Sequence, residues 1–319
     1  MFAVLLKLWR RIPESVRERI YRVLAWTGLP YSVSFVVRYS DSHKLPHFAG
    51  HLVSLKQDFA RSTGEHKKAL TGQFDGIIDN LVMKNGVRKT TYSARHASIM
   101  VSVLGGEPCR INKSEIRVLD VPSSTGISSL ASLEMLGRFY TVSAYVLGDL
   151  FFRIGYDRHR GCVYDDAGDL LQVKLKKQFF AIYRPHVSGN VYNPVADLLL
   201  LPFNVRSWYL KRKYRCKDPA SLEPILLIHP DVEARLGDGV LSTREMDVFK
   251  AIEDNFDVII SFNLLQKNYF PPALIEAGKE NLKYALNEGG LLIMGNTESF
   301  SVSRKIDGEL VVVERTGDF

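Results

Sequence analysis

The chain has few cysteines and no long apolar run, and each of these features excludes a class of protein. Three cysteines occur in 319 residues, Cys109, Cys162 and Cys216, with no short spacing between them. Such a sparse, odd set is typical of a reducing compartment and argues against a disulfide framework or a thiolate metal site. Because no stretch of about 18 apolar residues occurs, we expect no bilayer-spanning helix. The expected localisation is cytoplasmic.

Two further signatures are missing, those of a secretory signal and of a histidine metal site. In MFAVLLKLWRR, residues 1–11, no positive region precedes the apolar stretch and no small-residue cleavage site follows it. Histidines at 43, 47 and 51 are spaced four apart, as helical metal ligands can be. Pro46 and Gly50 interrupt such a helix, and no HExxH pattern accompanies it. We therefore predict neither a signal peptide nor a bound metal.

Acidic residues are scarce in one segment, so the net charge of +7 is uneven. Between residues 174 and 217, ten basic residues stand against Asp197 alone, and this segment carries +9 by itself. A local field of this kind implies an anionic partner for that region, or else a solvated basic face.

The first third of the chain has mainly helical patterning. It occurs over 12–28, 51–59 and 93–104, and Gly105-Gly106 then mark a boundary. The segment 12–28 is apolar on one face and rich in arginine elsewhere, which fits either an anionic membrane surface or packing on its own domain. We predict a helical N-terminal region over 1–112, followed by a second domain over 113–319.

The segment from 256 to 298 reads as strand, helix and strand. An apolar run at 258–260 leads to polar Asn263, residues 272–286 have helical length, and a second apolar run covers 291–294. Continuous Val, Ile and Leu runs joined by a helix are typical of parallel strands buried on both faces. Ligands of such sheets lie outside the carboxyl ends of the strands.

A strand–turn–helix unit lies upstream. Val118–Val121 form an apolar run, a turn of small residues covers 123–126, and 128–136 reads as a helix. A turn of small residues at a helix N-terminus presents backbone N–H groups to an anion or a carboxylate. A ligand site is therefore expected at this turn.

These motifs resemble those of the class I S-adenosylmethionine-dependent methyltransferases. LDVPSSTG at 119–126 is similar to their LDVGCGTG-type first motif. FDVIISFNLL at 256–265 and GGLLIMGNTE at 289–298 look like their later strands, as found in the chemotaxis-receptor type. The resemblance covers residues 115–319. It implies an α/β fold with a Rossmann-like methyltransferase sheet, and S-adenosyl-L-methionine as cofactor.

The resemblance also implies roles for individual residues. Asp120 corresponds to an acid near the methionine part of the cofactor, and Asp247 to the acid beside the adenine amino group, with Val248 or Phe249 near the ring. The alternative for Asp247 is a surface aspartate that caps a helix. The second core strand is expected over 140–146, which puts Val146 where the family has an acid for the ribose hydroxyls, so Asp149 is the expected substitute. The implied cofactor-binding set is Asp120, Ser123, Ser124, Thr125, Gly126, Asp149, Asp247, Val248 and Asn263.

Two residues are candidates for catalysis. Tyr269 resembles one of the aromatic pair after the chemotaxis-type motif, and it would hydrogen-bond an acceptor. His229 follows an apolar run at 225–228, where we expect the core sheet to resume, and it is a candidate general base. The competing readings are a half-buried packing tyrosine and a structural histidine.

The segment between the second core strand and 257 is about 110 residues long, too long for one crossover. We expect an inserted subdomain over about 151–220, with a hairpin formed by 163–164 and 170–173. Residues 198–217 follow, with LLLLPF, Trp208 and six basic residues. They are expected to form a peripheral membrane anchor or an acceptor-docking surface. Core leucines with solvated charges are the alternative.

Three functions remain open. The first is a methyltransferase, peripheral at the inner membrane face, that acts on a small-molecule, lipid-linked or anionic saccharide acceptor. The second is a binding module that has lost its donor, because Pro122 and Ser124 replace two of the usual glycines and Val146 the usual acid. The third is nucleic-acid methylation, suggested by aromatic residues among the basic ones. No NPPY-type motif occurs, and the neighbouring LLLLPF favours lipid over nucleic acid.

Overall fold

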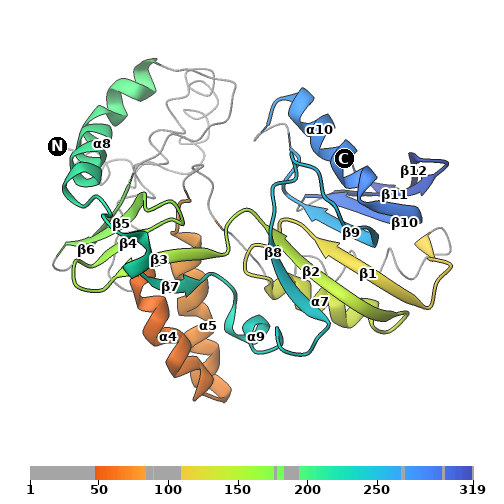
Figure 1. The fold of residues 1–319 in the computed structure, drawn as a ribbon, viewed down its shortest axis with the longest axis horizontal. Coiled ribbons are helices and arrows are strands. Elements are labelled where there is room, and N and C mark those ends of the chain that lie inside the picture. Colours follow the sequence, from red (N-terminus) through yellow and green to blue (C-terminus); the bar gives the residue numbers. More distant parts are fainter. Residues whose placement is uncertain are drawn as a thin grey trace, which may run out of the picture.

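The computed structural model contains two β-sheets that lie next to each other along the long axis of the molecule (Figure 1). It describes residues 47–83, 89, 109–175, 178–182, 194–266, 270–296 and 299–317. The helices expected over 12–28 and 93–104, and Tyr269, lie outside the described residues.

The larger sheet has seven strands in the order β12-β11-β10-β9-β1-β2-β8. Its strands are β1 (Glu115–Asp120), β2 (Thr141–Asp149), β8 (Leu241–Glu245), β9 (Phe256–Phe262), β10 (Leu286–Gly295), β11 (Phe300–Ile306) and β12 (Glu309–Thr316). The five strands from β10 to β8 are mutually parallel, whereas β11 is antiparallel to both its neighbours. This is the expected Rossmann-like α/β sheet, and it ends in a hairpin of β11 and β12 that turns at Asp307-Gly308.

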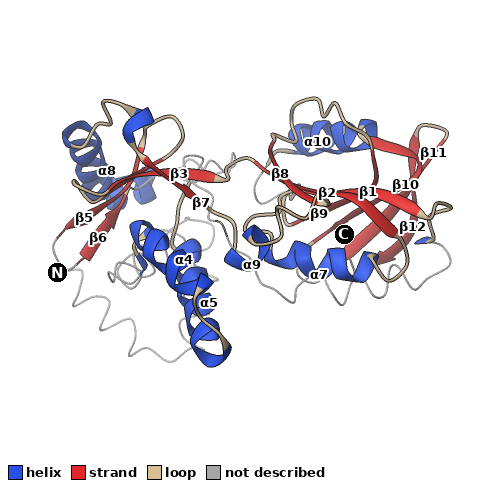
Figure 2. Cartoon of the chain, turned by 60° about the horizontal axis from the view of Figure 1, so that its bottom comes forward, coloured by secondary structure: helices blue, strands red, loops and turns tan. Residues whose placement is uncertain are grey.

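Helices α7 (Ile127–Leu136) and α10 (Pro272–Tyr284) cover opposite faces of this sheet (Figure 2). Alternate residues of each central strand supply the two cores. Val118 packs with Leu133 of α7, whereas the next residue, Leu119, packs with Ile275 of α10. Burial on both faces explains why these strands have continuous apolar sequences rather than alternating ones.

The strand order reverses at β1. The chain runs from β1 to β2 and later to β8 on one side, and it then returns to β9 on the other side of β1. Such a reversal opens a crevice outside the carboxyl ends of the strands, because the connections leave β1 and β9 in opposite directions. The predicted turn at 123–126 follows β1 directly and therefore lies at this point.

The smaller sheet is antiparallel, with the order β6-β5-β4-β3-β7. Its strands are β3 (Arg153–Asp157), β4 (Cys162–Tyr164), β5 (Leu170–Leu175), β6 (Gln178–Ala181) and β7 (Glu223–Leu226). β4 and β5 confirm the hairpin expected around 163–173. The expectation that the core sheet resumes at 225–228 is wrong, because Ile225 pairs with Ile154 of β3. The larger sheet resumes only at β8, since an apolar run of four residues predicts a strand but not its partner.

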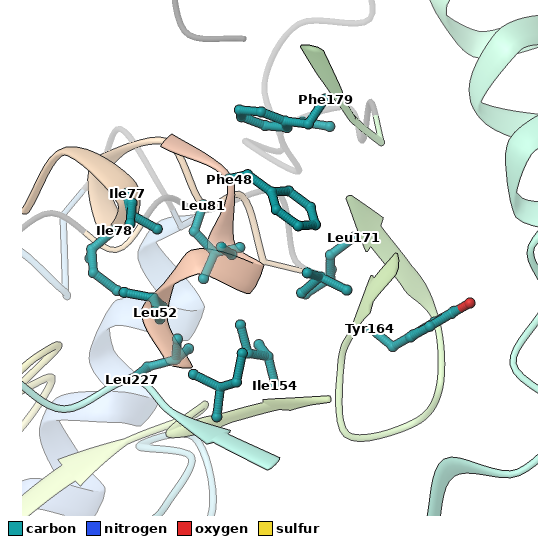
Figure 3. Packing of buried hydrophobic residues seen from close by; sticks show 14 of the residues in the cluster. Phe48, Leu52, Ile77, Ile78, Leu81, Ile154, Tyr164, Leu171, Phe179 and Leu227 are labelled. Atoms are coloured by element: carbon teal, nitrogen blue, oxygen red, sulfur yellow. The ribbon is translucent and has the colours of Figure 1, made fainter. Parts of the chain in front are cut away.

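The other helices in the described part of the chain are η3 (Ala49–His51), α4 (Leu52–Ala60), α5 (Gly64–Asp79), α8 (Pro194–Lys213), η5 (Pro219–Ser221) and α9 (Pro230–Glu233). Val232 of α9 packs in the core of the larger sheet. α4 and α5 share one core with the strands of the smaller sheet, in which Leu52 and Ile77 pack with Ile154, Leu171 and Leu227 (Figure 3). None of the helices in the described part of the chain is both long enough and apolar enough to cross a bilayer.

The chain passes between the two units at 151–152 and again at 227–228. Phe151 and Leu227 are buried in the core of the smaller sheet, whereas Phe152 and Ile228 are buried in the core of the larger one. The N–H of Leu227 donates to the carbonyl oxygen of Phe152 at 2.7 Å, so the two passages are also bonded to each other.

Candidate functional site

Four neighbouring strands of the larger sheet end in polar residues at one edge. Asp120 ends β1, Asp149 ends β2, Asn263 directly follows β9, and Asp247 comes two residues after β8. Since these four strands are parallel and adjacent, their carboxyl ends lie along the same edge. The fold thus brings together four predicted site residues that are far apart in sequence.

The turn after β1 is fixed by backbone bonds and by its unusual conformation. The N–H of Ser123 donates to the carbonyl oxygen of Gly148 at 2.8 Å, and the N–H of Gly126 donates to that of Ser123 at 2.8 Å. Ser124 and Gly126 have φ of 54° and 78°. A Cβ on Gly126 would lie 3.0 Å from side-chain atoms of both Leu147 and Val232, so both φ and space favour glycine there. The turn N-terminal to α7 is therefore rigid.

Asp149 is itself the end of β2. The strand runs three residues past Val146, so the predicted end at Val146 is wrong and no loop has to bend back. Gly148, near the end of the strand, is needed for packing, since a Cβ there would lie 2.6 Å from the Met246 sulfur. The Asp149 carboxylate therefore stands at the end of β2, beside the turn.

The Asp149 carboxylate has three partners. It accepts hydrogen bonds from the N–H of Ser124 at 2.9 Å and from that of Phe151 at 3.1 Å. Lys89 Nζ lies 2.8 Å from Asp149 Oδ1, with the two side chains 6% and 10% exposed. The Lys89 ammonium also lies over the Phe152 ring, 5.4 Å from its centroid. Lys89 stands in no motif, so no sequence signal pointed to it.

Asp120 is fully enclosed next to the turn. Its Oδ2 accepts a hydrogen bond from the Tyr145 hydroxyl at 3.1 Å. Burial raises the pKa of the Asp120 carboxyl to about 6, and the nearby Asp149 charge raises it too, while hydrogen bonds from Ser129 and Tyr145 lower it. The carboxyl of Asp120 thus changes its charge within the physiological range.

Several serine hydroxyls at this edge are buried without a partner among the described residues. They belong to Ser123 and Ser124 in the turn and to Ser261 near the end of β9. A buried hydroxyl without a hydrogen bond costs free energy, so such groups favour a polar ligand that supplies one. The residues at the switch point therefore fit a ligand with many polar atoms.

In the loop after β8, Asp247 lies in a turn, whereas Val248 is buried in the core. Asp247 Oδ1 accepts from the N–H of Phe249 at 3.1 Å and closes a turn, and no helix follows that it could cap. Val248 is buried in the core beneath α10, and its carbonyl oxygen accepts from the Asn281 amide at 2.9 Å. Phe249 lies edge-on to Phe270, with ring centroids 4.8 Å apart.

Asn263 lies in a tight turn with φ of 59°. Its N–H donates to the carbonyl oxygen of Gly295 at 2.8 Å, and its Oδ1 accepts from the Gln266 amide at 3.2 Å. Asn263 therefore ties the ends of β9 and β10 together at the site edge.

His229 is buried behind the turn. The backbone N–H of His229 donates to the Thr125 carbonyl oxygen at 2.9 Å, and the ring Nδ1 accepts from the backbone N–H of Asp231 at 3.2 Å. Phe59 and Phe74 meet the imidazole edge-on, and burial lowers its pKa to about 4. The ring is enclosed by Phe59 and Phe74, and its Nδ1 lone pair already accepts the Asp231 N–H, so no ring nitrogen is free to take a substrate proton, which contradicts the predicted general-base role. His229 instead supports the turn and caps α9.

Within the described ranges, no group of three or more His, Cys, Asp or Glu residues could hold an ion. Of the three spaced histidines, His47 and His51 are described and His43 lies outside the described residues.

The comparisons with known proteins found matches only among solved structures, and these matches are weak. No family model and no curated protein matches the chain. Among solved structures, the chain is similar to the N-methyltransferase NodS from Bradyrhizobium japonicum in complex with S-adenosyl-L-homocysteine (10% identity, TM-score 0.27). It is also similar to an O-methyltransferase family protein from Burkholderia thailandensis (11%, 0.32) and to a candidate S-adenosyl-L-methionine-dependent methyltransferase from Methanococcus maripaludis (13%, 0.32).

These matches are partial as well. They cover 63%, 72% and 74% of this chain, which in turn spans 59%, 42% and 66% of the three matched chains. The fold assignment accordingly depends on the strand order and the switch point described above.

Proposed function

We propose that the chain is an S-adenosyl-L-methionine-dependent methyltransferase whose donor binds at the carboxyl edge of the larger sheet. The observation that carries the proposal is the convergence of Asp120, Asp149 and the 123–126 turn at the reversal of strand order. The LDVPSSTG motif supplies that turn, and the donor is the ligand that its resemblance implies.

The residues present fit such a donor. The buried hydroxyls of Ser123, Ser124 and Ser261 offer hydrogen bonds to a polar ligand. The rigid turn holds backbone groups close to the crevice, and Asp120 and Asp149 are acids that can pair with the ammonium and ribose hydroxyl groups of a nucleoside–amino acid. Asp247 and Phe249, in the loop after β8, stand where the resemblance places the adenine.

Methyl transfer needs orientation more than it needs reactive side chains. When bound, S-adenosyl-L-methionine supplies an electrophilic methyl carbon on a sulfonium. The chain's part is to hold donor and acceptor in line, and such positioning can contribute about 7–11 kcal/mol in well-oriented intramolecular reactions. Asp120 and the turn are suited to that task, because both are fixed by contacts to β2.

The acceptor we propose is an anionic small molecule, either lipid-linked or a saccharide. Basic residues after β6 support this choice, since they lie on a unit joined to the site through Asp149 and Phe151. A positive surface raises the local concentration of an anionic acceptor.

Titration of the purified full chain with S-adenosyl-L-homocysteine tests the proposal. We expect a dissociation constant well below about 1 mM, which corresponds to only about 4 kcal/mol. Asp120→Asn should weaken the affinity severalfold or more. Asp307→Asn is the matched control, because it makes the same change in the remote β11–β12 turn, where φ is 53° and asparagine is tolerated. Binding weaker than about 1 mM by the wild type would contradict the donor assignment.

The Lys89–Asp149 ion pair favours a second candidate, a binding module that no longer takes the donor. Lys89 occupies one oxygen of the carboxylate that would accept the ribose hydroxyls. If this pair blocks the donor, Lys89→Met should create measurable S-adenosyl-L-homocysteine affinity where the wild type has none. If the pair merely orients Asp149, the same change should leave the affinity equal or lower.

A further inference from the structure

Among the described side chains of helix α8, at 201 and 204–213, apolar residues lie on two opposite sides, one buried and the other exposed. Leu210 is buried in the core of the smaller sheet, and Tyr214, one turn later, packs against that core. On the other side, four large side chains are 51–63% exposed: Leu201, Val205, Trp208 and Tyr209. Positions 201, 205, 208 and 212 recur every three or four residues and so lie on one face. Leu201, Val205, Trp208 and Tyr209 therefore form a continuous exposed stripe, which we call the α8 stripe.

Basic side chains border the α8 stripe. Lys211 and Lys213 lie on its flanks, and Arg212 continues it toward the C-terminal end of the helix, whereas the Arg206 guanidinium lies over the buried Phe180 ring, 4.4 Å from its centroid. The charged ends of two of them lie over its aromatic rings, with Arg212 5.9 Å from the Trp208 centroid and Lys213 5.8 Å from that of Tyr209. The alkyl stems of these side chains extend the apolar surface, while their charges remain at its rim.

A hollow of about 590 Å³ opens where the stripe ends. Five of its six lining residues are cationic: Arg160, Arg212, Lys213, Arg215 and Lys217, together with Cys216. The turn between β3 and β4 contributes Arg160, so the hollow is built from two segments that are distant in sequence. No carboxylate lines it, and it is therefore suited to a phosphate group.

We propose that the α8 stripe and this hollow dock the protein on the surface of an anionic phospholipid bilayer. Leu201, Val205 and Trp208 enter the interfacial region with the helix parallel to the membrane plane, and the hollow takes lipid phosphates. An apolar stripe with a basic border is the arrangement of helices that lie in the interface. The proposal goes beyond methyl transfer and does not depend on it.

The same residues argue against two other occupants. A nucleic-acid strand would stack on Trp208 and Tyr209, but the aliphatic Leu201 and Val205 would gain nothing from its bases or phosphates. In a dimer formed through the stripe, each copy would bring its basic border against the other, and like charges at an interface oppose association. A bilayer offers an apolar region to the aliphatic side chains and anionic headgroups to the basic ones.

Vesicle co-sedimentation with the full chain tests the proposal. We expect binding to vesicles of phosphatidylcholine and phosphatidylglycerol in equal parts, no binding to pure phosphatidylcholine, and a loss of binding as salt increases. The triple variant Arg212→Gln, Arg215→Gln, Lys217→Gln should bind on the order of a hundredfold more weakly. Trp208→Ser should weaken binding about tenfold or more, because the indole leaves water on docking.

Matched controls separate this surface from the rest of the chain. Lys68→Gln with Arg138→Gln and Lys250→Gln removes three exposed charges elsewhere, and Tyr284→Ser removes a side chain that is 72% exposed on α10. Both controls should bind the anionic vesicles like the wild type, and all variants should keep the wild-type affinity for S-adenosyl-L-homocysteine.

Three results would overturn the proposal. The first is that the α8 variants bind the anionic vesicles as the wild type does, which would place any membrane contact on other residues. The second is that a single-stranded oligonucleotide binds more tightly than the vesicles and is lost in the same variants. The third is a wild-type dimer that Trp208→Ser converts to a monomer.

Discussion

The two sheets of this molecule present their polar residues in different places. In the larger, parallel sheet, acids and hydroxyls gather at the ends of the strands, enclosed by the turn after β1 and the loop after β8. In the smaller, antiparallel unit, charge of the opposite sign gathers on the side, along α8 and around the nearby hollow. Strand polarity explains the contrast, because only parallel strands bring many carboxyl ends to one edge.

Because of this contrast, mutations in the two polar regions should affect different properties of the protein. Residues at the sheet edge are buried and bonded to one another, so changing them affects folding as well as ligand binding. Residues along α8 are exposed, so changing them should affect contacts with a partner and little else. The following predictions test this division, from the largest expected effect to the smallest.

Asp149→Ala should cause the largest loss of stability. It leaves the buried Lys89 ammonium without its partner and removes the acceptor of two N–H groups. Removing one member of a buried ion pair typically costs about 3–5 kcal/mol. Urea unfolding followed by circular dichroism measures the change. Asp247→Ala is the control and should cost only about 1 kcal/mol, since Asp247 accepts one hydrogen bond. Equal losses would show that Lys89 does not pair with Asp149 in solution.

Gly126→Val should be less costly, at about 2–4 kcal/mol. A left-handed φ costs a residue with a Cβ about 1–2 kcal/mol, and the contacts with Leu147 and Val232 add an overpacking cost. Gly239→Val isolates the first effect, because Gly239 has φ of 79° and nothing within 4 Å of its would-be Cβ. The difference between the two variants in urea unfolding measures the tightness of the turn. A folded Gly126→Val that binds S-adenosyl-L-homocysteine normally would remove the turn from the donor site.

Asp120→Asn should stabilise the protein above pH 6. The Asp120 carboxyl ionises at about 6 when folded, against an ordinary value of 3.8, so between these values the folded state binds more protons than the unfolded one. Stability therefore falls as pH rises through this window and is constant above it. Asparagine removes that loss, which is on the order of 3 kcal/mol, and its oxygen can still accept from the Tyr145 hydroxyl.

The measurement is urea unfolding of both proteins at several pH values across that window. The two curves of stability against pH should converge toward pH 4 and separate toward pH 7. Parallel curves would mean that burial does not raise the pKa of Asp120. Lower donor affinity together with higher stability would mark Asp120 as a residue kept for binding.

The α8 variants should show the smallest effect. Neutralising Arg212, Arg215 and Lys217, or replacing Trp208 by serine, should change the free energy of unfolding by no more than about 0.5 kcal/mol per residue, as is usual at exposed positions. Urea unfolding in the absence of lipid provides the test. A loss of several kcal/mol would show that these side chains hold the smaller unit together, and the contrast between the two regions would fail.

The parallel part of the fold was predictable from sequence. Runs such as Val258–Ile260 are apolar at every position, and this pattern arises where both faces of a strand are buried. The turn at 123–126 was predictable too, because small residues between a strand and a helix permit a close backbone approach. Asn263 followed from the end of the run at 258–260, whereas Asp120 and Asp149 came from the family resemblance.

What could not be predicted depends on partners that are distant in sequence. Ile225 begins an apolar run that suits either sheet, and only its pairing with β3 decides between them. His229 follows a strand, as a catalytic residue would, but α4 and α5 enclose it. Lys89 becomes visible only through its contact with Asp149. Local patterns specify elements, whereas these contacts arise from assembly.

The junction at 151–152 and 227–228 bears on how separable the two units are. Because neighbouring residues of each passage enter different cores, neither unit has a complete interior without the other's connecting segment. Phe152 and Ile228 would leave holes in the larger unit if the insertion were cut out, and the Leu227–Phe152 hydrogen bond would be lost as well. The smaller unit therefore cannot be exchanged as an independent module. A change of its sequence, in evolution or by design, has to preserve Phe151, Phe152, Leu227 and Ile228.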